Sequence, residues 1–118
     1  MAKITFIGAG SVEFTKNVLA DILTFPELST ATISLHDVDP DRLATAEAMA
    51  SWTNERLGTH ATVEAHLDRR AALDGTDYAI NAIAVGGLAA TKRDFELPKR
   101  FGLRQTIADT LGIGGIFR

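Results

Sequence analysis

The chain has 118 residues, 46% of them hydrophobic and 23% charged, and its 12 basic and 15 acidic side chains give a formal net charge of −3. This composition is typical of one globular domain, and the excess of acidic residues argues against a nucleic-acid-binding protein. The lack of cysteine excludes disulfides, thiolate metal sites and a cysteine nucleophile within these residues. No apolar run is long enough to span a bilayer and no signal peptide precedes the first strand, so we expect a cytoplasmic protein without membrane contact.

The first predicted element is a buried strand over residues 3–7, a short apolar segment rich in β-branched residues. It ends at Gly8-Ala9-Gly10-Ser11, which is typical of a tight turn before a helix. Ser11 is a suitable N-cap for that helix, and Pro26 is expected to end it. The apolar residues of the helix recur at helical spacing and are Phe14, Val18, Ile22 and Phe25, flanked by Leu19 and Leu23.

A second strand is predicted over residues 31–36, with Asp37-Val38-Asp39 at its carboxyl end. A second helix should follow, because Asp39 is a good N-cap, Pro40 suits the first helical position and Gly58 suits the end. Trp52 is expected to pack in the core or between helices, as is Phe14 of the first helix. The residues expected to form the buried stripe of the second helix are Leu43, Ala46, Met49, Ala50 and Leu57.

The rest of the chain continues the alternation of predicted strands and predicted helices. A third strand over residues 61–65 and a short helix over 69–73 precede a turn at Asp74-Gly75. Residues 78–85 are almost wholly apolar, which predicts a central strand covered by helices on both faces. A polar helix is predicted over residues 88–100, and the tail from residue 105 is rich in glycine without a clear period.

Alternating strands and helices predict an α/β fold, which the right-handed crossover rule makes a doubly wound, Rossmann-like parallel sheet. A complete dinucleotide-binding fold has two βαβαβ halves. This chain contains one half and an extension, so the predicted fold is truncated.

The glycine turn is the first candidate site, because a Rossmann fold binds a pyrophosphate between such a turn and the following helix. The usual third glycine is replaced by Glu13, whose side chain must face solvent if a pyrophosphate binds here. Asp37 lies where a carboxylate accepts hydrogen bonds from ribose hydroxyls and repels a 2′-phosphate, which favours NAD over NADP. The alternative is that the glycines only form a turn and Asp37 only ends a strand.

Two other groups of polar residues suggest simpler roles. His36, His60 and His66 could ligate a metal, but solvated or helix-packed histidines are expected. The run Lys92-Arg93-Asp94, with Glu96, Lys99 and Arg100, has mixed signs and predicts a solvated helix face rather than a ligand clamp.

Asp109 lies in a glycine-rich segment, residues 105–115, whose backbone could approach a ligand closely. Such a segment is either a functional loop or a flexible connection. The pattern alone does not choose between the two.

Four segments resemble the amino-terminal part of glycoside hydrolase family 4, whose members are related in fold to lactate and malate dehydrogenases. Together they span nearly the whole chain. The last one contains Thr-Ile-Ala-Asp-Thr-Leu-Gly, residues 106–112, which is most similar to the α-galactosidase (melibiase) branch. The four segments are residues 3–11, 37–43, 85–87 and 105–116.

The resemblance implies that residues 1–118 form the NAD-binding domain of a larger enzyme that hydrolyses α-galactosides or related α-glycosides. Such enzymes use NAD and a divalent metal, with manganese expected here. They transfer a hydride from C3 of the sugar to NAD, remove the C2 proton, expel the glycosidic oxygen from C1, add water and return the hydride.

The resemblance also assigns roles to residues of this chain. Asp109 matches the carboxylate that gives acid assistance to the leaving group, and Asp37 matches the ribose acid. Asn81, after the fourth strand, is a further candidate for cofactor contact. The residues that match the pyrophosphate turn are Gly8, Ala9, Gly10, Ser11 and Val12, the last through its N–H.

The family's metal-binding Cys and His and its catalytic base match no position here, so we expect no metal ligand in these residues and no activity from them alone. The expected partners are a small glycoside and further copies in a homo-oligomer. Two other functions stay open. One is part of an NAD-dependent 2-hydroxy-acid dehydrogenase, and the other is a non-catalytic nucleotide-sensing module, which would not need Asp109.

Overall fold

The computed structural model describes residues 1–106. The chain divides into two compact units after Ile83, and each is described by itself. The predicted acid Asp109 and most of the glycine-rich tail lie outside the described residues.

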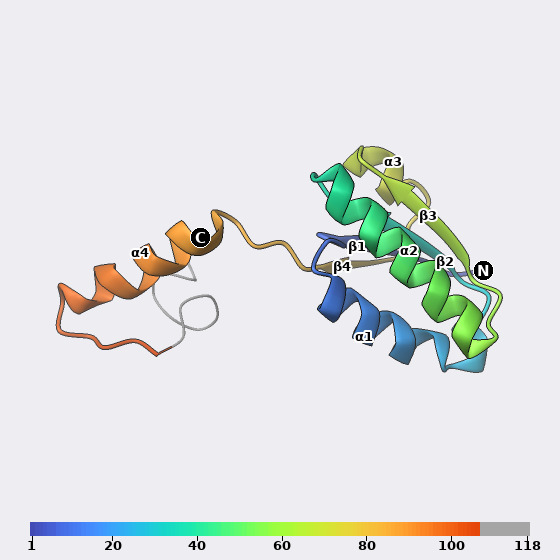
Figure 1. Ribbon diagram of the computed structural model, residues 1–118, viewed down its shortest axis with the longest axis horizontal. Coiled ribbons are helices and arrows are strands. Elements are labelled where there is room, and N and C mark those ends of the chain that lie inside the picture. The colour runs from blue at the N-terminus through green and yellow to red at the C-terminus, as the bar shows by residue number, and fades with distance from the viewer. Residues whose placement is uncertain (107–118) are drawn as a thin grey trace. The chain divides into compact units, whose positions relative to one another are not determined.

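The first unit contains four parallel strands, β1 (Lys3–Ile7), β2 (Thr32–His36), β3 (Thr62–His66) and β4 (Tyr78–Asn81), in the order β3-β2-β1-β4 (Figure 1). The chain adds strands on one side of β1 and then crosses to the other side for β4. The carboxyl ends of β1 and β4 therefore form the kind of switch point where open α/β sheets bind ligands.

The position of β4 differs from the prediction of a central strand over residues 78–85. The strand ends at Asn81 and lies at the edge of the described sheet, where Tyr78 is 65% exposed. Its apolar composition suggested two covered faces, but composition does not reveal which strands are its neighbours. Among the described strands, only β1 pairs with it.

Two faces of the sheet carry different helices. Helices α1 (Val12–Leu23) and α2 (Pro40–Leu57) lie side by side on one face (Figure 1), over the apolar side chains of Phe6, Ile33 and Leu35. Because side chains alternate along a strand, Thr5 and Ser34 point to the opposite face. There the hydroxyls of Thr5 and Ser34 donate to the carbonyl of Ala72 in α3 (Arg69–Leu73), at 3.1 and 2.9 Å.

The buried side of α1 is only partly the one predicted, because Val18 and Ile22 pack against the core but Phe14 and Phe25 are exposed. Its buried residues are Thr15, Leu19 and Leu23, whereas Phe14 is 46% exposed. The helix also ends before Pro26, because the residue that precedes a proline disfavours helical geometry. Pro26 instead begins a short 3₁₀ helix, η1 (Pro26–Leu28).

The ends of α2 are as predicted. The Asp39 side chain accepts from the backbone N–H of Asp41 and Arg42 at 3.0 and 3.1 Å, and Gly58 closes the helix with φ +65°. Its buried residues are Leu43, Ala46, Ala50 and Thr53. The predictions for Trp52 and Leu57 were wrong: both are exposed, and Trp52, one position off the stripe, stacks with Arg56.

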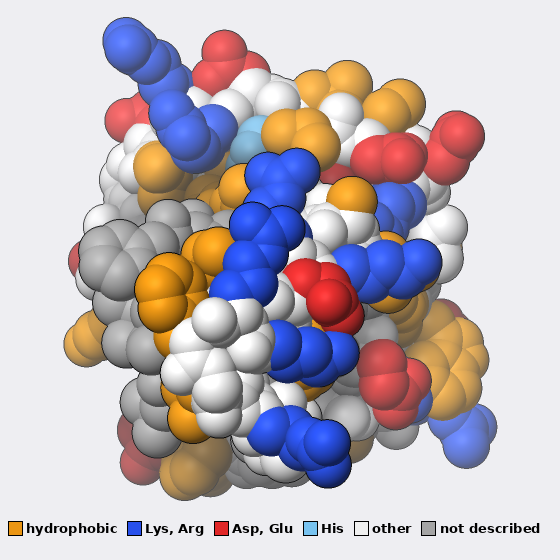
Figure 2. All heavy atoms as spheres, turned by 90° about the vertical axis from the view of Figure 1, so that its left-hand side faces the viewer, with side chains coloured by type: hydrophobic (Ala, Val, Ile, Leu, Met, Phe, Trp, Pro, Cys, Tyr) orange, Lys and Arg blue, Asp and Glu red, His pale blue; other side chains and the backbone are white. Residues whose placement is uncertain are grey.

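In the second unit, α4 (Gly87–Lys99) begins after Gly86, which has φ +78°. Most of its charged residues are exposed, as predicted for a solvated face, and Lys99 pairs with Glu96 at 2.8 Å. Asp94 is the exception, since it is buried. Figure 2 shows a face on which Lys and Arg side chains gather, with Asp and Glu among them.

No described helix is long and apolar enough to cross a membrane.

Candidate functional site

The glycine turn, residues 8–11, links the ends of three strands. The backbone N–H groups of Gly8 and Ala9 both donate to the carbonyl of His36, at 2.9 Å, which joins the end of β1 to the end of β2. The N–H of Ser11 donates to the carbonyl of Gly8 at 3.1 Å and closes the turn. The chain therefore turns tightly above the carboxyl end of the sheet.

Gly8 also sits against the residues that follow β4. Its φ is +87°, and a Cβ at this position would lie 2.7 Å from the carbonyl oxygen of Ala82. The N–H of Ala82 donates to the carbonyl of Ile7 at 2.8 Å. Asn81, the neighbouring candidate, is exposed at this switch point and accepts a 3.3 Å hydrogen bond from the N–H of Ile83.

The carboxylate of Asp37 lies against the middle of the glycine turn. One oxygen, Oδ2, accepts from the N–H of Gly10 at 2.8 Å, and Oδ1 accepts from the N–H of Asp39 at 3.0 Å. A Cβ at Gly10 would lie 2.5 Å from Oδ2, so only glycine allows this approach. Each carboxylate oxygen has two lone pairs, and the hydrogen bonds among residues 1–106 use one on each oxygen, so the other suits a ligand hydroxyl.

The first turn of α1 presents unused donors. Ser11 occupies the N-cap position, but its side chain makes no capping hydrogen bond, contrary to the usual role of such a serine. Within residues 1–106, the N–H groups of Val12, Glu13 and Phe14 have no acceptor. Together with the helix dipole, these donors favour an anion at this position.

Glu13 does not oppose an anion here. Its side chain is 80% exposed and pairs with Lys16 at 3.1 Å. The carboxylate is therefore solvated and partly neutralised, as binding of a pyrophosphate would require.

The histidines have structural or solvated positions. His36 is buried, with Nδ1 3.0 Å from the carbonyl oxygen of His66, and His60 is exposed. His66 lies 3.4 Å from Glu64, which also pairs with Lys3 at 3.2 Å. These two hydrogen bonds, from His66 and then Lys3, lower the pKa of Glu64. In the described part of the chain, no group of three or more acidic or histidine side chains could hold a metal ion.

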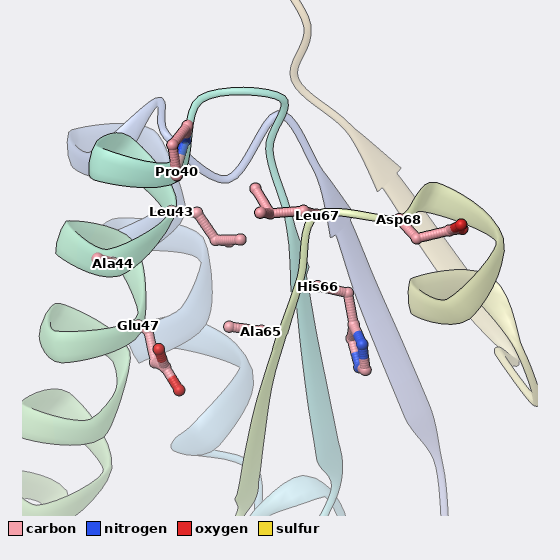
Figure 3. A pocket seen from close by; sticks show the side chains of 8 residues that line it. All are labelled: Pro40, Leu43, Ala44, Glu47, Ala65, His66, Leu67 and Asp68. Atoms are coloured by element: carbon pink, nitrogen blue, oxygen red, sulfur yellow. The ribbon is translucent and has the colours of Figure 1, made fainter.

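Two hollows lie near β3, and sequence patterns did not predict them. The first, about 470 Å³, lies between α2 and β3. Figure 3 shows Leu43 and Leu67 pointing into it, whereas His66 and Asp68 point away from α2. The second, between the ends of β2 and β3, is lined by His36, Val38, Leu67, Asp68, Arg69 and Arg70. Neither hollow includes the glycine turn. We assign the candidate site to the turn, Asp37 and the end of β4, because the backbone donors and the carboxylate described above lie there.

Residues 3–118 match the family described as "Family 4 glycosyl hydrolase". The chain is 51% identical to an α-galactosidase of Bacillus subtilis, over 100% of this chain and 28% of the relative. It is 40% identical to an α-galactosidase of Rhizobium meliloti, over 97% of this chain and 23% of the relative. It is 35% identical to an α-glucosidase of Erwinia rhapontici, over 98% of this chain and 26% of the relative. The chain thus spans about a quarter of the length of these relatives.

Solved structures show the same fold. One is a 6-phospho-β-glucosidase from Thermotoga maritima with manganese, NAD⁺ and glucose-6-phosphate, which matches with a TM-score of 0.76 and 22% identity over 98% of this chain and 27% of that one. Another is a 6-phospho-α-glucosidase from gut microorganisms with NAD and Mn²⁺. It matches with a TM-score of 0.77 and 20% identity over 98% of this chain and 26% of that one. The α/β, Rossmann-like prediction is therefore confirmed.

Proposed function

The chain belongs to glycosyl hydrolase family 4, and we propose that residues 1–118 form the NAD-binding region of a larger enzyme that hydrolyses α-galactosides. The two α-galactosidases among its relatives support this substrate class. Family membership favours the glycosidase over a 2-hydroxy-acid dehydrogenase or a nucleotide-sensing module.

The observation that carries the proposal is the joint arrangement of free donors and a buried acceptor at the switch point. The N–H groups at the start of α1 that have no acceptor within residues 1–106 fit the anionic pyrophosphate of NAD. Asp37, held in place by Gly10 and Asp39, fits the adenosine ribose hydroxyls. The lack of a side chain at Gly8 and Gly10 leaves room for the cofactor's approach.

When bound, NAD supplies the oxidation and re-reduction of the sugar that this type of hydrolysis uses. The described residues contribute binding and orientation. Val12 and its neighbours donate to the pyrophosphate, Asp37 fixes the ribose, and Asn81 is proposed to contact the cofactor beside Gly8. The second cofactor, a divalent metal, has no fitting set of ligands among residues 1–106, so we propose no step through it here.

Asp109 is proposed to assist departure of the glycosidic oxygen as an acid. The support is its place in residues 106–112, which resemble the corresponding segment of the α-galactosidase branch. The proposed substrate is a small α-galactoside.

A homo-oligomer and a cytoplasmic location stay predictions.

Calorimetric titration of the folded chain with NAD and with NADP tests the proposed cofactor. Circular dichroism first establishes that the chain is folded. Saturable binding that favours NAD supports the proposal, and absence of binding to a folded chain contradicts it.

A further inference from the structure

The hydroxyl of Thr15 holds the glycine turn from the side of α1. Thr15 is fully buried, with 0% of its surface exposed, and its Oγ1 donates to the carbonyl oxygen of Ala9 at 3.0 Å. A threonine inside a helix commonly donates to the carbonyl four residues earlier, as Thr45 and Thr53 of α2 do at 2.9 Å. Thr15 instead reaches six residues back, to a residue that precedes its helix.

The carbonyl of Ala9 and the N–H of Gly10 belong to one peptide group. At the other end of that group, the N–H of Gly10 donates to Oδ2 of Asp37 at 2.8 Å. The hydroxyl of Thr15 and the carboxylate of Asp37 therefore hold opposite ends of the same planar unit. Within residues 1–106, no other donor reaches the carbonyl of Ala9.

Gly10 alone would not fix this peptide. Because glycine tolerates a wide range of backbone angles, the peptide that precedes it rotates at little cost. A hydrogen bond to the carbonyl of a peptide also polarises that peptide and strengthens the hydrogen bond that its N–H donates. The Thr15 hydroxyl therefore orients the Gly10 N–H and makes it a better donor to Asp37.

We propose that Thr15 is a positioning residue for the cofactor, which acts through the Ala9–Gly10 peptide on the carboxylate of Asp37. Asp37 is 8% exposed, and its Oδ1 is held by the N–H of Asp39 at 3.0 Å. With both oxygens held, the remaining lone pairs keep one direction toward the ribose hydroxyls. Thr15 is fully buried, so it acts through this peptide rather than by contact with the dinucleotide. This inference rests on the proposed binding of NAD.

The test compares variants that keep or remove the hydroxyl. Thr15→Val removes it with little change of shape, Thr15→Ala removes it if the valine variant does not fold, and Thr15→Ser keeps it. Thr5→Val is the matched control, because the Thr5 hydroxyl is also fully buried and donates to a backbone carbonyl, that of Ala72, on the opposite face of the sheet. Circular dichroism checks that each protein is folded, and calorimetric titration measures its affinity for NAD.

We expect Thr15→Val and Thr15→Ala to weaken NAD binding by about threefold or more, a factor within the range of one net hydrogen bond. Thr15→Ser should bind NAD more tightly than Thr15→Val, and Thr5→Val should bind it as the unaltered chain does. Unaltered affinity in a folded variant without the Thr15 hydroxyl would overturn the inference. An equal loss of affinity in Thr15→Ser or in Thr5→Val would overturn it too.

Two further measurements separate positioning from a general loss of stability. In a double-mutant cycle, Thr15→Val should weaken NAD binding much less when Asp37 is already replaced by alanine, because Thr15 acts through that carboxylate. In NMR spectra of the free chain, Thr15→Val should move the Gly10 amide proton upfield, whereas Thr5→Val should leave it in place. Additive losses in the cycle, or an unmoved Gly10 amide in Thr15→Val, would contradict the proposed role.

The titration of the unaltered chain separates this inference from the proposed function. If that chain does not bind NAD, the proposed cofactor is wrong and the inference fails with it. If it binds NAD and only the variants behave otherwise than expected, the proposed function stands and the inference alone is overturned.

Discussion

Gly8 and Ala82 approach each other so closely that a side chain at Gly8 would displace the end of β4. A Cβ there would lie 2.7 Å from the carbonyl oxygen and 2.9 Å from the carbonyl carbon of Ala82, both backbone atoms. The switch point of the sheet therefore requires glycine for space as well as for its φ of +87°.

Gly8→Ala should destabilise the chain by about 2 kcal/mol or more, because it adds this contact to the cost of a left-handed backbone. Urea unfolding, followed by circular dichroism, measures the change. Gly75→Ala is the control, since Gly75 also has positive φ, at +68°, but open space around it. Equal losses of stability in the two variants would show that the contact with Ala82 contributes nothing.

Asp37→Ala should weaken NAD binding by about tenfold or more, because it removes the charged acceptor for the ribose hydroxyls. Calorimetric titration measures the dissociation constant. Asp41→Ala, an exposed aspartate in the first turn of α2, removes the same charge nearby and should have little effect. An unchanged NAD affinity in folded Asp37→Ala would remove Asp37 from the site.

The parts of this fold that sequence predicted well depend on local chemistry. Asp39, Pro40 and Gly58 mark the ends of α2 through hydrogen bonds and φ values that involve only nearby residues. The meeting of Gly10 with Asp37 was predictable for a different reason. Both follow neighbouring parallel strands, whose carboxyl ends lie at one edge of the sheet.

The errors arose where long-range packing decides the outcome. Helix α1 has apolar residues on more than one side, and the sheet and α2 select Leu19 and Leu23 rather than Phe14 for burial. Likewise, no local pattern shows that Arg42 contacts Gly10, because the contact depends on how α2 packs beside the turn. Its place five residues after Asp37 is the one signal that could have suggested it.

The stability of the chain should depend on pH through Glu64. Hydrogen bonds from His66 and Lys3 lower the pKa of Glu64 from its ordinary value of 4.5. A carboxylate whose pKa is lowered in the folded state stabilises the fold at pH values above its unfolded-state pKa. This contribution is lost as the pH falls below 4.5. The side chain is 38% exposed, so solvent limits the contribution to about 1 kcal/mol.

Glu64→Gln should therefore lower the free energy of unfolding at pH 7 by up to about 1 kcal/mol. The difference from the unaltered chain should shrink as the pH is lowered through the acid range. Urea unfolding at a series of pH values tests this, with Glu47→Gln on the exposed side of α2 as the control. A difference that stays constant down to the lowest pH would contradict a role for the Glu64 charge.

Asp109→Asn tests the proposed acid in the whole enzyme of which we propose that this chain forms part. Protonation helps most when the departing oxygen is strongly basic, so alkyl α-galactosides should be slowed more than aryl ones with good leaving groups. The measurement is kcat/KM over a series of leaving groups, for the unaltered enzyme and the variant. Asp41→Asn makes the same chemical change in α2 and should not alter the dependence on the leaving group. Equal slowing across the series would assign Asp109 to substrate positioning instead, because a lost binding contact affects all leaving groups alike.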